Sequence, residues 1–485
     1  MRKFACSLIL ILTLCLSVQA DTFIPPKEQW LAIYIGDSQV GYTHERVVPE
    51  KNSSGEITGW GLSGNVEMKI PAFGMVMKIE LVQYAFLNPD FSFNRFQFKM
   101  DSSGATINCR GEVEGNKLNL SMKSMGTPST QTIELNKPIY LPEAVAWRIA
   151  QGKSQKGTKF EVPIYDPLNT TMGTIVSEVL GMEKITVEGV EYDSYKVKSI
   201  YMGFEQETWI GLDGHTLRET SQVGGMPFKT EKTSEEKAKS YGAAPISRVL
   251  DLVDSSKIKT NLYFDNPRDI KDSTIRISGI SPNDMVIDNI QKLINKTDSY
   301  FDVNIKTPFV NLETLPSKLE NTQSYTKYLN SSLLIQSDNP KIEKQAKKIA
   351  GKSESPLKIS QELSKWLYRN INKEFRVTIP SAIEVLESQK GDCNEHSTLF
   401  AALARSLGIP AKICTGVVYM EGAFWYHAWN EVLISTEPEI WWPIDSTQGG
   451  NFVDATHIKL AEGDLMDQAS NLGKVMGKME INKVQ

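Results

Sequence analysis

The segment from Gly391 to Gly449 constrains the fold of this chain more than any other stretch of its 485 residues. Leucines recur every fourth residue between Asn394 and Leu407, and Gly408-Ile409-Pro410 follows at once, a combination that predicts a helix and its end. Cys393 stands directly before this helix. Its thiol is therefore expected at a helix N-terminus, where unpaired N–H groups and the positive end of the helix dipole favour a thiolate.

A strand and a hairpin are predicted after the helix. Residues 424–434 alternate between two faces, with His427 on one of them, which is typical of a strand. A turn-forming stretch at 435–438 separates this run from the apolar residues 440–444, so the two runs are expected to pair as an antiparallel hairpin. If the turn is centred near residue 436, Asp445 lies directly opposite His427, with Cβ atoms roughly 5 Å apart. A carboxylate in that position fixes the tautomer of an imidazole and stabilises its cation.

Short motifs in this segment resemble those of a known family. They are G-D-C-N-E-H-S at 391–397, L-G-I-P-A-K at 407–412, H-A-W-N-E-V at 427–432 and W-P-I-D-S-T at 442–447. In this order and at this spacing they resemble the transglutaminase-like core, a branch of the papain-like cysteine enzymes. The resemblance covers about residues 340–450, and it departs from the family at Lys412, where arginine is common, and at Ser446, where many members have proline.

The resemblance implies a role for each of three residues. Cys393 is the nucleophile, His427 is the general base and acid, and Asp445 is the orienting carboxylate. Neither departure touches these positions. We expect no cofactor and no metal ion at this site.

The chain is too long for one hydrophobic core, and about 150 residues per domain predicts roughly three domains. The division that we predict is a signal peptide at 1–20, a β-rich domain at 21–228, a linker at 229–245, a small β-containing module at 246–325 and the transglutaminase-like domain at 326–485. The expected fold class is α+β, with helices packed on an antiparallel sheet in the C-terminal core and a large antiparallel β-rich domain before it.

The β-rich domain is inferred from alternation along the first half of the chain. Leu118, Leu120 and Met122 alternate with polar residues, and Asp213-Gly214 is a hairpin signal. Residues 142–151 predict the one helix that covers this sheet, with a second helical turn near 176–181. The polar run that begins at Lys229 reads as a linker whose first part can form an exposed helix.

The first residues have the pattern of a secretory signal. Two basic residues precede the apolar run Phe4 to Val18, and small residues stand at the −3 and −1 positions for cleavage before Asp21. Cleavage is favoured over lipid attachment at Cys15, because Leu14 is not the small residue that such a site needs. We therefore expect an exported protein, periplasmic or secreted. No later run of 18 apolar residues predicts a membrane span, and a net charge of −5 gives no footprint for nucleic acid.

Three cysteines remain after such cleavage: Cys109, Cys393 and Cys414. The odd number in an exported protein leaves at least one thiol free, which fits a catalytic cysteine. Cys414 reads as a small buried hydrophobe, and a Cys109–Cys414 disulfide is an open alternative. His44, His215 and His457 have no partner that the sequence identifies, so they read as surface or structural histidines.

The leading hypothesis is acyl transfer on a protein or peptide substrate, including substrates of the cell envelope. Cys393 attacks a carboxamide or peptide carbonyl, and the thioester is resolved by water or by a primary amine. Hydrolysis or a broad acyl-transfer activity is favoured, because the sequence shows no sign of the calcium-regulated domains that accompany animal cross-linking enzymes. The oligomeric state is not predicted.

Two other classes are weighed beside it. A non-catalytic binding or scaffold protein would use the β-rich domain, but an intact Cys, His and Asp argues against it. A zinc enzyme using Cys393, His396 and His427 lacks an HExxH motif. For the thiol enzyme, the N–H of Cys393 is one oxyanion donor and Gln389 or Trp366 is a candidate for the second. The tryptophans that can line an acyl-donor cleft, or simply form a sheet face, are Trp425, Trp429, Trp441 and Trp442.

Overall fold

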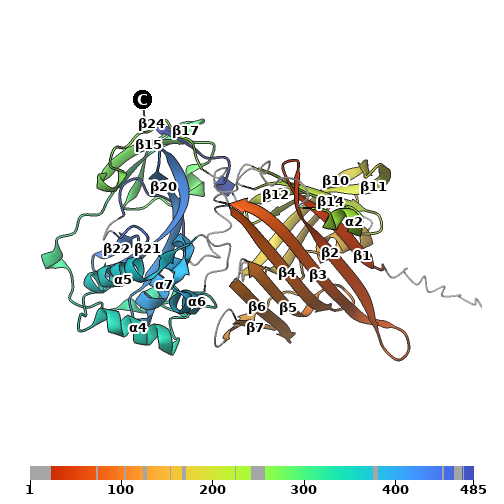
Figure 1. The fold of residues 1–485 in the computed structure, drawn as a ribbon, viewed down its shortest axis with the longest axis horizontal. Helices are drawn as coiled ribbons and strands as arrows, with labels where there is room; N and C mark the ends of the chain where they lie inside the picture. The colour runs from red at the N-terminus through yellow and green to blue at the C-terminus, as the bar shows by residue number, and fades with distance from the viewer. Residues whose placement is uncertain are drawn as a thin grey trace, which may run out of the picture.

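The computed structural model describes residues 23–72, 75–102, 105–123, 128–152, 154–166, 171–223, 226–241, 257–374, 381–449, 453–463, 472 and 474–484. The signal peptide predicted at 1–20 lies outside these residues. The chain forms two lobes, an N-terminal lobe built on one large sheet and a mixed C-terminal lobe (Figure 1). Within the described ranges, no helix has the length and apolar character needed to span a membrane.

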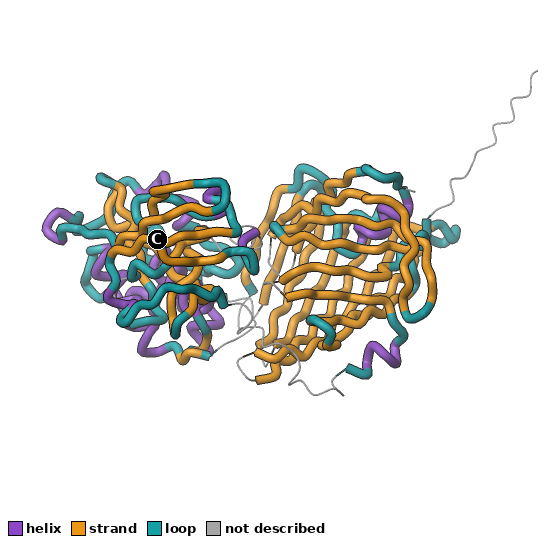
Figure 2. Tube along the Cα trace, turned by 90° about the horizontal axis from the view of Figure 1, so that it is seen from above, coloured by secondary structure: helices purple, strands orange, loops and turns teal. Residues whose placement is uncertain are grey.

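The N-terminal lobe contains a 14-stranded antiparallel sheet with the strand order β8-β7-β6-β5-β4-β3-β2-β1-β14-β13-β12-β11-β10-β9. Its strands are β1 Glu28–Ile35, β2 Ser38–Lys51, β3 Ile57–Ala72, β4 Met75–Leu87, β5 Phe93–Ser102, β6 Ala105–Glu114, β7 Lys117–Lys123, β8 Ser129–Glu134, β9 Lys159–Asp166, β10 Thr171–Val187, β11 Val190–Tyr201, β12 Phe204–Gly211, β13 Thr216–Val223 and β14 Met226–Lys232. Consecutive strands are neighbours, except that β8 and β9 stand at the two ends of the order and β1 pairs with β14. Figure 2 shows the strands running side by side across the lobe. The predicted antiparallel sheet is confirmed.

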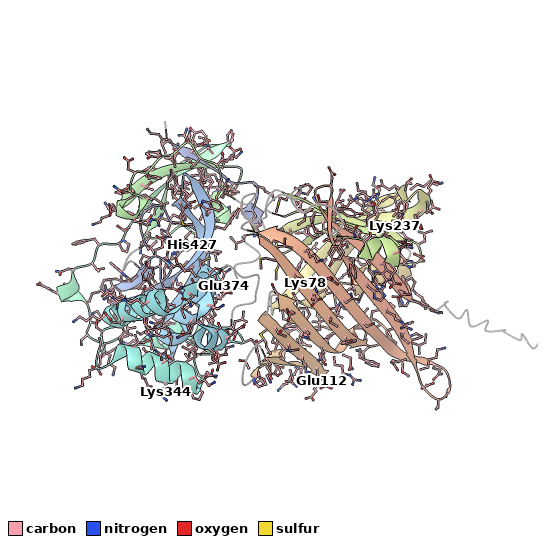
Figure 3. All side chains as sticks on the ribbon, in the orientation of Figure 1. Lys78, Glu112, Lys237, Lys344, Glu374 and His427 are labelled. Atoms are coloured by element: carbon pink, nitrogen blue, oxygen red, sulfur yellow. The ribbon has the colours of Figure 1, made fainter. Side chains whose placement is uncertain are left out.

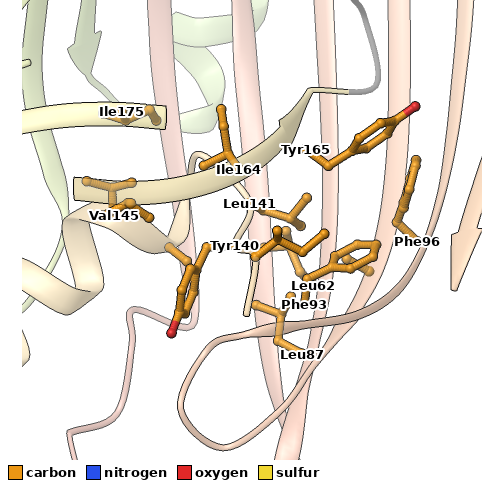
Figure 4. Packing of buried hydrophobic residues seen from close by; sticks show 14 of the residues in the cluster. Leu62, Leu87, Phe93, Phe96, Tyr140, Leu141, Val145, Ile164, Tyr165 and Ile175 are labelled. Carbon is orange, nitrogen blue, oxygen red and sulfur yellow. The ribbon is translucent and has the colours of Figure 1, made fainter. Parts of the chain in front are cut away.

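α1 Ala144–Gln151 packs against one face of this sheet, close to the predicted helix at 142–151. Trp147 of α1 meets Phe91 edge to face, with ring centroids 5.6 Å apart. The segment before α1 also packs on the sheet. Tyr140 and Leu141 of this segment, together with Val145 of α1, lie among strand side chains (Figure 4). Burial of such aromatic and aliphatic surface is the main term that stabilises the lobe.

Two sequence predictions for this lobe were wrong. The helical turn expected near 176–181 lies inside β10, which pairs with β9 on one side and β11 on the other. Gly181 there marks a β-bulge, and the ladders satisfy the backbone that a helical turn would have used. Lys229 to Lys232, assigned to the linker, are the end of β14 and pair with β1. The exposed helix that was expected next is α2 Glu235–Lys239, capped by Ser234.

The C-terminal lobe has two four-stranded sheets and a group of helices. One sheet has the order β16-β17-β15-β24 and the other β22-β21-β20-β23. The strands are β15 Asp272–Ser278, β16 Gln291–Lys296, β17 Tyr300–Lys306, β18 Asn372–Lys373, β19 Lys390–Gly391, β20 Ala411–Met420, β21 Ala423–Thr436, β22 Glu439–Ile444, β23 Ile458–Gly463 and β24 Glu480–Lys483. The helices are α4 Pro340–Ala350, α5 Pro356–Asn370, α6 Ala382–Ser388 and α7 Cys393–Ser406, and the 3-10 helices are η2 Pro267–Asp269, η3 Pro282–Asp284, η4 Leu312–Thr314 and η5 Thr322–Tyr328.

The helices pack on the β20–β22 sheet, as the α+β prediction required. Leu399 and Leu403 of α7 are fully buried with Leu363 of α5 and Val432 of β21 in one hydrophobic cluster. The helical period of the leucines is what places them on this buried face. The lobes meet at Leu333 and Leu334, which pack into the hydrophobic cluster of the N-terminal lobe.

The strands at 272–306 do not stand apart from the C-terminal core. β15 pairs with β24 near the end of the chain, and Ile258 forms a bridge to Phe424 of β21. Ile275 and Phe301 share a hydrophobic cluster with Val417 of β20. This region therefore packs against the sheet that contains β20 and β21, and His427 lies on β21.

Candidate active site

Cys393 is the first residue of α7, so the predicted place of the thiol at a helix N-terminus is confirmed. Asp392 caps the helix: its carboxylate accepts from the N–H of Asn394 at 2.9 Å, and the Glu395 carboxylate accepts from the N–H of Asp392 at 2.9 Å. This capping box fixes the entry of the chain into the helix. Gly391 makes it fit, because a Cβ at that position would stand 2.2 Å from Cβ of Glu395. The thiol is half-buried, at the start of a rigid helix.

His427 lies on β21 in the C-terminal lobe, where Figure 3 labels it, and its side chain is buried. Its Nε2 is 2.9 Å from Oδ2 of Asp445, which is also buried. β21 is tied to α7 by Asn430, whose Nδ2 donates to the carbonyl oxygen of Ser397 at 3.0 Å. Helix and hairpin are therefore held in one register across the site.

The contact between His427 and Asp445 was predicted, but the register behind the prediction was wrong. The ladder pairs Thr436 with Glu439 and Asn430 with Ile444, so the turn lies at 437–438 rather than at 436. Asp445 follows the last residue of β22, and continuing the register would set it opposite Trp429. It reaches His427 as a diagonal neighbour, a relation that lies within the reach of side chains across a sheet.

The side chain of Cys393 interacts with the ring of His427. Burial disfavours the charged imidazole, but the Asp445 carboxylate and the Cys393 contact outweigh it and raise the pKa of His427 to about 9. Burial likewise opposes the ionised form of Asp445, and its two imidazole neighbours still hold the pKa of Asp445 well below its usual range. The arrangement favours a carboxylate–imidazolium pair beside the thiol at neutral pH.

The second oxygen of Asp445 is held by a local turn. Oδ1 accepts from the N–H of Thr447 at 2.8 Å and from its hydroxyl at 2.6 Å. Aspartate and threonine two residues apart commonly form such turns. Because Oδ1 is engaged in this way, Oδ2 is left to face the imidazole of His427.

A fourth residue of the site was missed by sequence reasoning. His457, read there as a surface or structural histidine, is buried, and its Nε2 lies 3.4 Å from Oδ2 of Asp445. It follows an Asp454-Ala455-Thr456 turn that repeats the Asp-x-Thr pattern of 445–447, and Thr456 donates to Asp454 from its N–H at 2.8 Å. That repeat is the signal that could have pointed to His457. His44 and His215 lie instead in the N-terminal lobe, beside Glu28 and Asp213.

The zinc set Cys393, His396 and His427 is not supported by the geometry. The Nδ1 of His396 lies 2.7 Å from the carbonyl oxygen of Asp392, so this nitrogen donates within its own helix turn. Over the described ranges, two other groups have ligand atoms within 4.8 Å of one another: His427, Asp445 and His457, and Cys414, Glu431 and Glu462. The ammonium of Lys459 already neutralises the second group, at 2.6 Å from Glu431 and 3.1 Å from Glu462.

The other residues considered from sequence have mainly structural positions. Trp366 packs against the helix-side hydrophobic cluster, and Gln389 has a left-handed backbone at the C-terminus of α6. The four tryptophans do not form one cleft. Trp442 is buried on the helix side, Trp441 packs on Tyr325 and Tyr328, Trp425 donates to Met420, and Trp429 meets the ring of His457 edge to face at 5.2 Å.

The three cysteines in the described part of the chain, Cys109, Cys393 and Cys414, are free thiols, and the open disulfide alternative is contradicted. Cys109 lies in the hydrophobic cluster of the N-terminal lobe, whereas Cys414 is buried with Trp429 and Val453 in the C-terminal lobe. The two sulfurs thus belong to separate cores. Cys414 is the small buried hydrophobe that its sequence context predicted.

Comparisons with known proteins agree with this geometry at the level of the family. Residues 343–446 match the model of the transglutaminase-like superfamily. Solved structures that resemble the chain include a "putative cysteine protease" from Cytophaga hutchinsonii (19% identity, 44% of this chain and 81% of that chain, TM-score 0.33) and a "beta-barrel-like protein" of a domain of unknown function from Brucella abortus (11% identity, 44% and 98%, TM-score 0.32). A third is a "putative protease" from Parabacteroides distasonis (10% identity, 86% and 67%, TM-score 0.20).

A search among curated proteins gave no match. Residues 343–446 of this chain match the transglutaminase-like superfamily, and they follow a large β-rich domain in the sequence.

Proposed function

We propose that this protein is an exported thiol enzyme that carries out acyl transfer on peptide or carboxamide substrates through a thioester. The observation that carries the proposal is the connected set of side chains at the N-terminus of α7. The Cys393 side chain interacts with His427, whose Nε2 lies 2.9 Å from Oδ2 of Asp445. A nucleophile, a base and a group that orients the base are the minimum for nucleophilic acyl transfer.

The three residues divide the reaction between them. His427 takes the proton of the Cys393 thiol, and the sulfur attacks the carbonyl carbon of the substrate. His427 then gives that proton to the departing amine as the C–N bond breaks, which leaves a thioester on the sulfur. Water or a primary amine then attacks the thioester while His427 takes up its proton, and the C–S bond breaks. Asp445 stabilises the imidazolium throughout and keeps Nδ1 turned toward the sulfur.

The position of Cys393 also supplies part of an oxyanion hole. The N–H groups of the first turn of a helix have no partner within the helix. Asp392 takes the N–H groups of the second and third helical residues, Asn394 and Glu395, in the capping box. The N–H of Cys393 itself is therefore the donor of this turn that is suited to a developing oxyanion on a substrate bound at the sulfur.

We assign the substrates to proteins or peptides outside the cytoplasm, with hydrolysis as the preferred outcome of the thioester. The location rests on the signal pattern before Asp21, and the preference for water rests on the sequence having no calcium-regulated accessory domain. A search with glutamine peptides and a labelled amine separates the two outcomes. Deamidated or cleaved peptide marks hydrolysis, and amine-labelled peptide marks transamidation.

The test of the reaction class is to trap the acyl-enzyme. The protein beginning at Asp21 is incubated with a peptide library and quenched in acid, and its intact mass and peptide map are recorded. We expect a hydroxylamine-sensitive adduct on Cys393 that Cys393→Ala lacks. Cys109→Ala, a change in the other lobe, is the matched control and should form the adduct normally. Turnover without any adduct, or with full activity in Cys393→Ala, would overturn the proposal.

A further inference from the structure

His457 stands between two carboxylates. Its Nε2 lies 3.4 Å from Oδ2 of Asp445, and its Nδ1 lies 3.3 Å from both Oδ2 and the carbonyl oxygen of Asp454. Carboxylate and carbonyl oxygens only accept hydrogen bonds, so each ring nitrogen is satisfied only if it carries a proton. The surroundings of His457 therefore require the doubly protonated, cationic ring.

The second carboxylate is itself held in place as an anion. The guanidinium of Arg268 lies 2.7 Å from Oδ2 of Asp454, and the hydroxyl of Thr456 donates to Oδ1 at 2.5 Å. Arg268 comes from η2 and also donates to the side chain of Gln448 and to the carbonyl oxygen of Tyr419. Arginine stays charged at all relevant pH values. Arg268 thus fixes Asp454, and Asp454 fixes His457.

His457 and His427 share one carboxylate oxygen. Oδ2 of Asp445 is 2.9 Å from Nε2 of His427 and 3.4 Å from Nε2 of His457, and the two ring centroids are 5.8 Å apart. An imidazolium at His457 neutralises part of the negative charge of Asp445, which would otherwise act on His427 alone. It also repels the positive charge of a protonated His427 at that distance. Both effects weaken the hold of His427 on its own proton.

We propose that His457 is a positioning residue of this site, an imidazolium that shares Asp445 with His427 and so makes His427 a better proton donor to the departing amine. The proposal rests on the acyl-transfer function proposed above, because a proton donor is needed only if Cys393 expels an amine. Without the sharing, His427 would bind its proton so tightly that its release would slow acylation.

The other groups that face the two histidines come from every element around them. Cys393 and His396 reach the site from α7, Trp429 from β21, Asp445 and Thr447 from the end of β22, and Asp454 from the loop before β23. His396 is electrically coupled to Asp445 and to Lys373, but its Nδ1 is already engaged with the carbonyl oxygen of Asp392. Among these groups, His457 alone adds a hydrogen bond to Oδ2 of Asp445 from a second imidazole.

The inference is tested by following each histidine directly in the protein from Asp21 onward, with ¹³C at Cε1 of its five histidines. Each signal is assigned by its loss in a His→Asn variant, and the pH is raised from 5 to 10.5. In His457→Asn the pKa of His427 should rise by about one unit or more, as expected when a neighbouring cation is removed. The matched control is His215→Asn, which breaks a His–Asp contact of 2.8 Å in the other lobe and should leave His427 unchanged.

Asp454→Asn provides a second variant that keeps His457 in the protein. Loss of one of its two carboxylates should lower the pKa of His457 itself and raise that of His427 by a smaller amount. Unchanged titration of His427 in both folded variants would overturn the inference. If His457→Asn does not fold, the Asp454→Asn titration decides alone: a raised pKa of His427 supports the inference, and an unchanged pKa overturns it.

The same preparations separate this inference from the proposed function. The titration of His427 is measured without any substrate, so it reports on His457 even if no acyl-enzyme ever forms. An adduct on Cys393 combined with no shift at His427 would remove the inference and leave the enzyme. A shift at His427 with no adduct would do the reverse. Where turnover is measurable, the alkaline limit of its pH profile should move upward in His457→Asn.

Discussion

The two lobes bury their ionisable groups in opposite ways. In the C-terminal lobe, buried carboxylates face cations: Asp445 faces His427 and His457, and Glu431 lies 2.6 Å from the ammonium of Lys459. In the N-terminal lobe, Glu45, Glu143 and Glu219 line one cavity of about 370 Å³ together. Their hydrogen-bond donors there include the neutral side chains of Gln29, Gln83 and Thr230.

The difference predicts opposite responses to pH for the three glutamates and for Asp445, whereas Glu431 resembles the glutamates because burial raises its pKa despite Lys459. Burial raises the pKa of Glu45 from its ordinary 4.5 to about 8, and it raises the pKa of Glu143 and Glu219 as well. Glu45 therefore stabilises the folded lobe below about pH 4.5, and this contribution is lost as the pH rises through 8; Glu143 and Glu219 contribute in the same direction. Asp445 and Asp454 have lowered pKa values despite their burial, so their contribution is lost as the pH falls below the ordinary value of 3.8.

Thiol chemistry should show the largest contrast between the lobes. Burial raises the pKa of Cys109 to about 12 and that of Cys414 well above its ordinary value, whereas Cys393 is half-buried at a helix start. Iodoacetamide at pH 7 should label Cys393 and spare the other two thiols until the protein is denatured. Peptide mapping by mass spectrometry shows which of the three cysteines is alkylated. Equal labelling of all three cysteines in the folded protein would contradict the assignment of the nucleophile.

The next largest effect is expected for the orienting carboxylate. Asp445→Asn should lower turnover by about 10⁴, because an amide stabilises neither the imidazolium nor the productive tautomer. The fold and the labelling of Cys393 should survive. The double change His427→Ala with Asp445→Asn should be little worse than His427→Ala, since members of a triad act as a unit. Losses that multiply, measured as acyl-enzyme formation rates, would remove Asp445 from the triad.

Replacing a lysine should affect stability differently in the two lobes, even where the ion-pair distance is the same. Lys459 lies 2.6 Å from Glu431 in the buried core, and Lys184 lies 2.6 Å from Glu191 on the surface of the sheet. Lys459→Met should cost about 3–5 kcal/mol, because it leaves buried carboxylates without their cation. Lys184→Met should have no measurable effect. Urea unfolding, monitored in each lobe by hydrogen exchange, measures the free energy of unfolding of the two variants. Equal losses of stability in Lys459→Met and Lys184→Met would contradict the comparison.

The smallest effect concerns the acidic cavity, and it depends on pH. Glu45→Gln removes a carboxyl that must ionise as the pH passes 8, so the variant should be more stable than the parent at pH 9 and nearly equal to it at pH 5. Hydrogen exchange of β1 and β2 measures the difference. Greater stability of the parent at pH 9 would mean that a cation neutralises the cavity.

A glycine opposite the histidine shows what only the packed structure could reveal. Gly416 pairs with His427 across β20 and β21, and a Cβ there would lie 1.8 Å from the carbonyl oxygen of Ile458. In the sequence, Thr415-Gly416-Val417 reads as an ordinary strand interior in which glycine is slightly unfavourable. The need for glycine comes from β23, which lies about forty residues away along the chain and closes on the same strand.

The sequence alone determined the elements whose signals are local. The period of the leucines and the Gly-Ile-Pro stop placed the helix after Cys393, and the alternation of 424–434 placed His427 on a strand. These signals depend on neighbours within a few residues, which the sequence shows directly. The contact between His427 and Asp445 was also within reach, because a diagonal neighbour tolerates an error of two residues in the pairing of the strands.

Tertiary structure decided the features that depend on distant segments. The pairing of β15 with β24 and the approach of His457 to Asp445 depend on how distant segments pack, and no local pattern gives either contact. The Arg268–Asp454 ion pair likewise joins segments 186 residues apart, positions 268 and 454. Local propensity specifies a strand or a helix, but the charge that faces a buried side chain is set by whichever segment packs against it.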